Sequence, residues 1–330
     1  MTATAVAPHE SSRTKLLLGF AAVYLFWGST YLFIRWAVET LPPFGMAGVR
    51  FCIAGGSLYL WTRLRGGERP TLRMWRSSAI VGALLMASNA GVAFAEKRIP
   101  SGVASLLVGM TPCWFVLLDW LRPGGKKPGS GVVIGLVGGI AGVAILVGPG
   151  QLAGAHHLDT LGATVVLVGS FAWAVGSIYS RHAERPSSAL QGSAMHMLCG
   201  GLALTLVSVV IGQYRDFSFA QVSARSALAF VYLIVFGSLV GFSAFVYLLR
   251  ATTPARVATY AYVNPVVAVF LGWAFAGEEL TVRVLLASLV IIGSVVLITT
   301  FGSERPRTAK AVASATTRDA ADAAVLEEVP

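Results

Sequence analysis

Ten long apolar stretches follow one another along this chain, separated by short polar segments. A helix that crosses the hydrocarbon core of a bilayer needs about 20 such residues. Charged residues make up only 12% of the sequence, whereas a soluble domain carries about a quarter, so the chain lacks the polar surface that water requires. We therefore expect an all-α integral membrane protein with ten transmembrane helices, at 16–37, 43–62, 77–95, 100–120, 131–148, 158–180, 190–211, 226–248, 254–275 and 281–301.

The second half of the sequence repeats features of the first. Pro112 before an apolar run reappears as Pro265 before another, and Trp27 and Trp173 are each followed by an arginine eight residues later. Five helices per copy would place the second copy upside down relative to the first, around a central cavity. The expected division is an N-terminal tail (1–15), two inverted five-helix repeats (16–148 and 158–301) and a disordered C-terminal tail (302–330).

Lysine and arginine are distributed unevenly over the expected loops. Eighteen lie in the tails and loops of one side, whereas the other side carries only Lys97, Arg98, Arg215, Arg225 and Arg283. Positive residues mark the cytoplasmic side of a membrane protein, so both termini are expected in the cytoplasm. The net charge of +10 is thereby explained by topology and does not indicate nucleic-acid binding.

The sequence offers no recognisable catalytic or metal-binding pattern. Cys52, Cys113 and Cys199 each lie inside an apolar stretch without metal-ligand spacing, and no phosphate-binding G-x-x-x-x-G-K-[ST] run occurs. The expected spans also lack a clustered acid, base and nucleophile set. We expect neither an enzyme nor a cofactor or metal site.

Two prolines lie near the middle of expected helices. Pro112 and Pro265 each lie about twelve residues into a span, and each would free the carbonyl four residues earlier, on Val108 and Ala261. A freed carbonyl in lipid needs another partner. Two such positions at one depth favour a polar cavity between the halves, with Pro112 and Pro265 as hinges. The alternative is a packing kink in a rigid bundle.

Polar and aromatic side chains share helix faces close to these prolines. Tyr260 and Asn264 are four residues apart, as are Trp27 and Tyr31. Aromatic rings with a few hydroxyl and amide groups suit a small amphipathic metabolite, although such rings also serve as packing or interfacial residues. The candidate substrate-binding residues are Trp27, Thr30, Tyr31, Arg50, Asn89, Trp173, Ser177, Tyr260, Tyr262 and Asn264.

Three ionisable residues lie within or at the ends of expected spans. Arg50 is about seven residues into its helix, where an arginine is costly unless it is paired, functional or extended toward the interface. Glu96 ends the third helix on the face of Asn89, and His196 lies in the seventh. Glu96 and His196 are the candidate proton-coupling groups. The alternative for His196 is a structural role, in which its ring only forms hydrogen bonds within the fold.

Glycines recur at four-residue spacing in the fifth expected helix. Gly135, Gly138, Gly139 and Gly142 form two overlapping G-x-x-x-G patterns. Such patterns let helix backbones approach closely. This face is expected to pack on another helix or on a second copy of the chain in a homodimer.

Three motifs carry a resemblance to a known family. The runs WGSTY at 27–31, AGVRF at 47–51 and YAYVNPVV at 260–267 resemble the EamA family of the drug/metabolite transporter superfamily, especially its YedA-like bacterial inner-membrane members. The resemblance covers residues 16–301. It implies ten helices, cytoplasmic termini, a cavity walled by helices 1, 3, 4, 6, 8 and 9, and export of amino acids or other small metabolites, commonly with proton coupling.

Together these features predict a secondary active exporter of small metabolites or drugs that works by alternating access in the cytoplasmic membrane. A flippase for a lipid or lipid-linked sugar is the main alternative, because the same architecture could open sideways to the bilayer. A passive channel is disfavoured because rings of charge and filter-like motifs are not evident.

Overall fold

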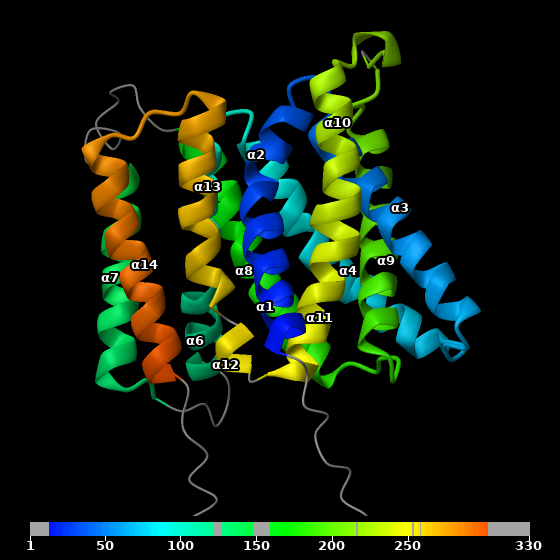
Figure 1. The fold of residues 1–330 in the computed structure, drawn as a ribbon, viewed down its shortest axis with the longest axis horizontal. Coiled ribbons are helices and arrows are strands. Elements are labelled where there is room, and N and C mark those ends of the chain that lie inside the picture. The colour runs from blue at the N-terminus through cyan, green and yellow to red at the C-terminus, as the bar shows by residue number, and fades with distance from the viewer. Residues whose placement is uncertain are drawn as a thin grey trace, which may run out of the picture.

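The computed structural model describes residues 13–121, 127–147, 159–215, 217–252, 254–257 and 259–302, and these ranges contain helices and no strands. The helices run roughly antiparallel to one another (Figure 1). The first helix begins, and the last helix ends, at the bottom of this view. We call this end the terminal face and the opposite end the distal face. Most of the expected tails and the junction at 148–158 lie outside the described residues.

The first half contains five helical segments, two of which are irregular. A single span, Arg13–Ala37, is made of two α-helices with a π-helical turn between them, and Ser101–Leu121 is divided in two. The elements are α1 (Arg13–Ala22), η1 (Val23–Trp27), α2 (Gly28–Ala37), α3 (Pro43–Leu64), α4 (Leu72–Ala95), α5 (Ser101–Val108), α6 (Thr111–Leu121) and α7 (Ser130–Val147).

The second half has the same number of segments within the described residues. The span Ala224–Leu249 includes a π-helical stretch, and the segment before the last helix is divided in two. The elements are α8 (Thr160–His182), α9 (Ala189–Val210), η2 (Phe219–Gln221), α10 (Ala224–Tyr232), η3 (Leu233–Val240), α11 (Gly241–Ala251), α12 (Pro254–Val257), α13 (Tyr260–Ala276) and α14 (Val282–Gly302).

Several helices begin where a short polar side chain precedes an apolar run. The Thr71 hydroxyl accepts a hydrogen bond from the Met74 amide (3.2 Å) before α4, and the Asp159 carboxylate accepts one from the Gly162 amide (2.6 Å) before α8. These bonds satisfy amides that the first turn of a helix leaves unpaired. The Gly162 amide and Arg98 both lower the pKa of the Asp159 carboxyl.

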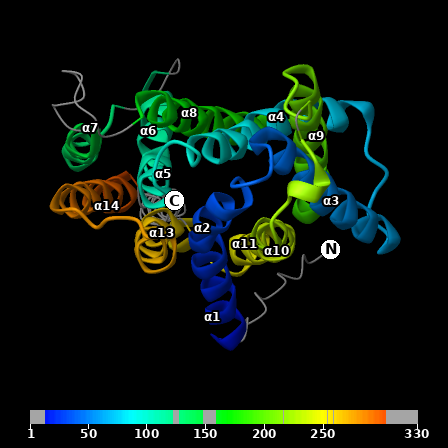
Figure 2. The ribbon, with the colours of Figure 1, turned by 90° about the horizontal axis from the view of Figure 1, so that it is seen from above.

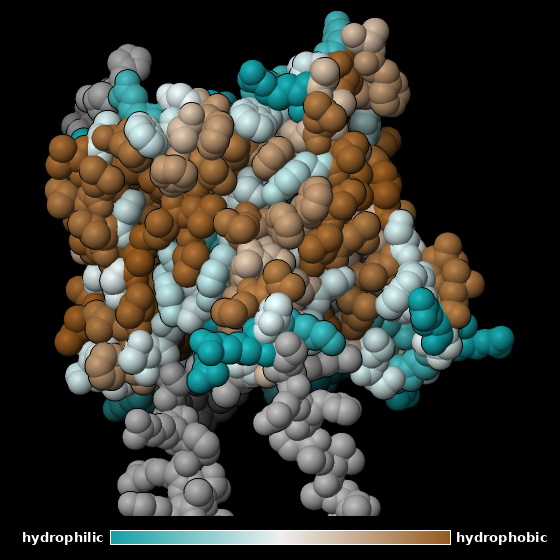
Figure 3. Space-filling view, in the orientation of Figure 1, coloured by the Kyte–Doolittle hydropathy of each residue, from teal (hydrophilic) through white to brown (hydrophobic). Residues whose placement is uncertain are grey.

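The outer surface of the bundle is apolar between its two ends. Figure 3 shows a band of hydrophobic side chains bounded by hydrophilic residues at both faces. Within the described residues, seven helices are long and apolar enough to cross a membrane, and Ser130–Leu146 and Tyr260–Ala276 are shorter apolar helices. The 22-residue α3, which carries Arg50, is not among these. The chain is therefore an all-helical membrane protein, while length and composition alone do not establish ten spans.

The two proline-containing segments differ from each other. Helix α5 ends at Val108 and α6 begins at Thr111, so Pro112 lies in the first turn of α6, where its missing amide hydrogen costs little. The Val108 carbonyl accepts a hydrogen bond from the Thr111 hydroxyl (2.6 Å). The expected partner for a freed carbonyl is thus present.

The prediction of one continuous helix at 254–275 is wrong. Helix α12 ends at Val257 and α13 begins at Tyr260, so the interruption precedes Pro265. Pro265 is the sixth residue of α13, and the helix continues through it. Proline removes one backbone hydrogen bond, which a helix with packed neighbours tolerates. The predicted depth of Pro265, twelve residues into a helix, is therefore incorrect.

Helices at the same position in each half pack against each other. Helix α3 lies along α9, α7 lies along α14, and α5 contacts α13. Figure 2 shows the α7–α14 pair at one end of the molecule and the α3–α9 pair at the other. Gly135 and Gly142 of α7 face α14, because β-carbons added there would lie 2.7 and 2.6 Å from Ile298 and Ile291, whereas Gly139 faces Met110 and Cys113. The glycine pattern thus packs a helix of the same chain; a homodimer stays a prediction.

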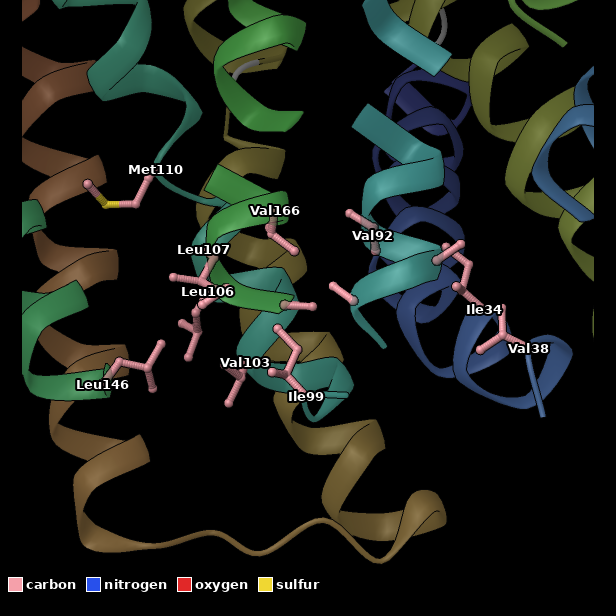
Figure 4. Packing of buried hydrophobic residues seen from close by; sticks show 14 of the residues in the cluster. Ile34, Val38, Val92, Ile99, Val103, Leu106, Leu107, Met110, Leu146 and Val166 are labelled. Carbon is pink, nitrogen blue, oxygen red and sulfur yellow. The ribbon is translucent and has the colours of Figure 1, made fainter. Parts of the chain in front are cut away.

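A cluster of buried apolar residues fills the bundle toward the distal face. Its members include Ile34 and Val38 at the end of α2, Val92 at the end of α4, and Ile99 and Val103 around the start of α5 (Figure 4). These helix ends meet at the distal face, so the cluster closes that end of the bundle. This packed end limits how far the space between the two halves extends toward the distal face.

Candidate functional site

A cavity of about 550 Å³ lies between the two halves of the chain. It is lined by η1, α2, α3, α4, α5 and α6 of the first half, and by α8, η3, α11, α12, α13 and α14 of the second. Eight of the ten candidate binding residues and both prolines line it: Trp27, Thr30, Tyr31, Arg50, Asn89, Pro112, Trp173, Tyr260, Asn264 and Pro265. The fold therefore gathers side chains that are far apart in the sequence.

The cavity extends from the middle of the bundle to the terminal face. Arg181, Leu249 and Thr299 line it near the ends of α8, α11 and α14, all of which end at that face. Toward the distal face, the lining stops at Ile34 and Val92. These two residues belong to the buried apolar cluster. The cavity is thus closed at its distal end.

A second hollow of about 720 Å³ lies at the distal face. It shares no lining residue with the central cavity. Its lining includes four basic and two acidic residues: Arg35, Lys97, Arg98, Arg283, Glu278 and Glu279. Val103 lines this hollow, while Ser105, two residues later, lines the central cavity. The wall between the two spaces is therefore only a few residues thick along α5.

An aromatic cluster forms one wall of the central cavity. The Trp27 ring lies 5.3 Å from Phe242, 5.1 Å from Phe245 and 5.3 Å from Tyr260, measured between ring centroids. The rings of Trp27 and Tyr260 meet at 84°, an edge-to-face arrangement that aromatic quadrupoles favour. The Trp27 indole nitrogen also donates to the Gly237 carbonyl (3.2 Å). These contacts fix the orientation of Trp27.

Arg50 lies on α3 with only 3% of its surface exposed. Its Nε donates to the Ser238 hydroxyl (2.9 Å), and its guanidinium lies over the Phe51 ring at 4.7 Å. A β-carbon added at Gly237 would lie 2.9 Å from the Arg50 Nη2 atom. A larger residue at position 237 would therefore require the guanidinium to shift from its place beside η3.

Two asparagines line the cavity in different states. The Asn89 side-chain amide donates to the Leu85 carbonyl of its own helix (3.2 Å). Asn264 is 7% exposed, and its Oδ1 has no hydrogen-bond partner among the described residues. A buried polar atom without a partner is costly, and a ligand or water can remove that cost. Of the two asparagines, Asn264 is therefore the more available for a hydrogen bond with a ligand.

Four predicted residues do not line the cavity: Tyr262, Ser177, His196 and Glu96. Tyr262 follows Tyr260 by two residues, which places it about 200° around the helix from the cavity-facing tyrosine. Ser177 lies on α8 between the cavity residues Trp173 and Arg181, but its short side chain is not part of the lining. His196 lies on α9, which packs against α3 and α4.

Glu96 follows α4 directly and is completely buried, yet it does not line the cavity. Neither of its carboxylate oxygens has a hydrogen-bond partner among the described residues. Arg35 donates to the backbone carbonyls of Glu96 and Ile99 instead. Burial raises the pKa of the Glu96 carboxyl well above its usual range, Glu278 raises it further, and Arg35 opposes this shift.

Glu278 connects the two halves at the distal face. Helix α13 ends at Ala276, the following Gly277 turns the chain with its positive φ of 67°, and the Glu278 amide donates to the Gly272 carbonyl (3.1 Å). The Glu278 carboxylate accepts hydrogen bonds from the amides of Ser101 (2.6 Å) and Gly102 (3.0 Å). This acid thus caps the start of α5 from the other half of the chain.

Some features of the site have no clear sequence signal. Phe242 and Phe245 are ordinary residues for an apolar span, and nothing in their spacing marks them as cavity residues. The π-helical segments η1 and η3 hold Trp27 and Gly237, respectively. Such wide turns often occur at functional sites.

An all-helical bundle with an apolar belt and a closed-ended internal cavity defines a membrane transporter. The model of the EamA-like transporter family matches residues 14–148 and again 160–300, so the chain belongs to this family. It is 40% identical to the uncharacterized inner membrane transporter YedA of Escherichia coli strain K12, over 84% of this chain and 88% of YedA.

More distant relatives and a solved structure are consistent with this assignment. The uncharacterized transporter YvbV of Bacillus subtilis is 27% identical, over 88% of this chain and 92% of its own. Protein PecM of Dickeya dadantii is 26% identical, over 82% and 88%. One crystal structure superimposes with a TM-score of 0.59 at 20% identity, covering 88% of this chain and 99% of the other, which supports the fold alone.

Proposed function

We propose that this protein is a secondary active transporter that exports small metabolites, such as amino acids or related amphipathic compounds, by alternating access. The observation that carries the proposal is a central cavity that reaches the terminal face and is closed toward the distal face. A carrier exposes its binding site to one side at a time. Residues from both halves line the cavity, so relative movement of the halves would change its access.

The helix pairing supports an inverted repeat. The second segments of the two halves, α3 and α9, pack together, and so do the fifth segments, α7 and α14. A two-fold axis in the membrane plane would bring the helices that lie beside it next to their counterparts in this way. The same axis would turn the contact between α4 and α8 into the contact between α10 and α2. Both contacts are observed. The two halves would then exchange roles during transport.

The distribution of charge supports a cytoplasmic terminal face in a bacterial inner membrane. Arg63 lies in the last turn of α3, the connection to α4 at the terminal face contains Arg65 and Arg69, and Arg73 and Arg76 follow in the first turns of α4. Loops enriched in positive residues stay in the cytoplasm. The central cavity would then be open to the cytoplasm, as an exporter requires for loading.

Glu96 is the proposed proton-coupling group. Its carboxylate is buried and has no hydrogen-bond partner within the part of the chain that the structure describes. Glu278, Arg35 and Tyr31 are its electrostatic neighbours, and Tyr31 lines the cavity. A group whose pKa is raised can bind a proton near neutral pH and release it when its surroundings change. Neither Glu96 nor His196 lines the cavity, and Glu96 is the stronger candidate because its electrostatic neighbour Tyr31 does.

The test is counterflow in liposomes that contain the purified protein, with amino acids, purines and cationic drugs as substrates. A carrier predicts that unlabelled substrate inside the liposome accelerates uptake of labelled substrate. Glu96→Gln should retain this exchange but lose accumulation driven by a pH gradient. Glu39→Gln, at an exposed acid on the distal surface, is the matched control. Uptake without trans-stimulation would contradict a carrier, and unchanged accumulation in Glu96→Gln would contradict its coupling role.

A further inference from the structure

The charges around the central cavity have one sign within the described residues. Arg50 and Arg181 line it, and no aspartate or glutamate does. Helices α2, α3, α4, α8, α11 and α13, which supply much of the lining, contain no acidic residue along their whole lengths. Asp119 on α6 is the one acid in the described helices, and it does not line the cavity.

Arg50 is the buried member of this positive pair. A buried cation normally needs a counter-charge as well as hydrogen bonds. The elements packed against α3 are α4, α9 and η3, and none of them carries a carboxylate. The partner that the structure gives to its Nε is the neutral hydroxyl of Ser238. The protein thus leaves the negative charge to be supplied from the cavity.

The aromatic wall and Arg50 adjoin each other at Gly237. The Gly237 carbonyl accepts the Trp27 indole hydrogen bond, and the α-carbon of the same residue borders the Arg50 guanidinium. A ligand with its acidic group at Arg50 would therefore place an attached ring or apolar body beside Trp27. The unpartnered Oδ1 of Asn264 offers an acceptor for a hydroxyl or amide hydrogen on the same ligand.

We propose that the central cavity binds an organic anion, with its acidic group at Arg50 and an apolar or aromatic body against the Trp27 and Tyr260 rings. This proposal rests on the proposed function and narrows its substrate class to related compounds without an ammonium group, so ordinary amino acids are excluded. A cationic drug would place like charges together, and the ammonium of a zwitterion would find no carboxylate in the lining. An anion without an ammonium group satisfies Arg50 and leaves no ligand charge unpaired.

A matched charge series tests this proposal. The three compounds 3-phenylpropionate, phenylalanine and phenethylamine share a phenylethyl group and carry a negative charge, both charges and a positive charge, respectively. Titration calorimetry on the full chain in detergent should give the tightest binding for 3-phenylpropionate. Phenyl phosphate and benzenesulfonate, measured in parallel, distinguish a carboxylate site from a phosphate or sulfonate site.

Substitution of Arg50 links the preference to this residue. Arg50→Gln should weaken binding of the preferred anion by about 10- to 100-fold, as expected for loss of a charged hydrogen-bonded partner. Binding of phenethylamine should be unchanged or improved. Arg50→Lys should fall between these values. Arg225→Gln, at an exposed arginine on the distal surface, should behave as wild type.

Several outcomes would overturn the proposal. One is that phenylalanine or phenethylamine binds as tightly as 3-phenylpropionate or more tightly. The others are unchanged anion binding in folded Arg50→Gln, and no binding of 3-phenylpropionate, phenyl phosphate or benzenesulfonate. If Arg50→Gln does not fold, the charge series on the wild type decides alone. Anion binding without counterflow would refute transport but keep this site. Counterflow of amines or zwitterions alone would keep transport and refute this site.

Discussion

Gly237 allows two functional side chains to occupy adjacent space. Its carbonyl holds the Trp27 indole, and its missing side chain leaves room for the Arg50 guanidinium. Because both contacts involve one residue in a π-helical segment, a small change there should affect both recognition elements. We therefore expect the site to be especially sensitive to substitution of Gly237.

Gly237→Ala should weaken anion binding by about tenfold or more. The added β-carbon would lie 2.9 Å from Arg50 Nη2 and 2.9 Å from the Thr30 Cγ2 atom, so the guanidinium must move and its ligand contact weakens. Calorimetry with 3-phenylpropionate measures the change. Gly293→Ala on α14 is the control, because no atom lies within 4 Å of its added β-carbon. Wild-type affinity in Gly237→Ala would show that Arg50 does not depend on this contact.

Trp27→Ala should reduce affinity for an aromatic ligand by about tenfold, because each aromatic contact contributes about 0.5–1.5 kcal/mol. Trp27→Phe should retain more affinity, since the ring stays and only the hydrogen bond to Gly237 is lost. The same calorimetric titration provides the measurement. Trp273→Ala, at a residue that is 51% exposed on the outer surface, serves as the control. Equal affinities in all three variants would remove Trp27 from the site.

The sequence predicted individual site residues where polarity stands out against an apolar span. Arg50, Asn264 and Trp27 were recognisable for this reason, and all three line the cavity. Tyr262 was included because it is polar and close to Tyr260, but helix geometry turns it away. Phe242 and Phe245 could not be predicted, since phenylalanine in a membrane helix is equally suited to lipid contact and to a ligand wall.

At the scale of elements, helix interruptions position the site. Helix α6 begins with Thr111 and Pro112 at the cavity, and α13 begins with Tyr260. Helix ends at membrane depth are tolerated where they line a cavity. The sequence predicted most of the helices because apolar length is a strong signal. It did not predict the interruption before Tyr260 or the π-helical segments, because these depend on packing against neighbouring helices.

Glu278→Ala should lower the midpoint of thermal unfolding. Loss of its carboxylate leaves the Ser101 and Gly102 amides at the start of α5 without their acceptor, a loss of about 0.5–2 kcal/mol for a helix cap. Glu278→Gln should lie between wild type and Ala, because its carbonyl oxygen still accepts. Differential scanning fluorimetry in detergent measures the midpoints. Glu279→Ala, at the exposed neighbouring acid, is the control, and an equal shift there would contradict a specific cap.

At the scale of the whole molecule, the two halves meet differently at the two faces. Toward the distal face, buried apolar residues, the Glu278 cap and the Arg35 contacts with backbone carbonyls join the elements. Toward the terminal face, the cavity separates the same halves. The duplication in the sequence predicted a space between the halves. Its asymmetry could not be predicted, because it reflects which of two related packings the chain adopts.

The most direct test of alternating access is the sidedness of a cavity cysteine. Val108 lines the central cavity and Val284 lines the distal hollow. Each is replaced by cysteine in a chain that lacks Cys52, Cys113 and Cys199, and sealed vesicles are treated with a membrane-impermeant maleimide from either side. Val284→Cys, labelled from the distal side only, verifies the orientation of the vesicles.

We predict that Val108→Cys reacts from the terminal side in the unliganded protein. Weakening the distal contacts with Glu278→Ala, or adding a transported substrate, should increase its reaction from the distal side while the reaction from the terminal side falls. Simultaneous reaction from both sides at constant rates, or no distal reaction under any of these conditions, would contradict the account.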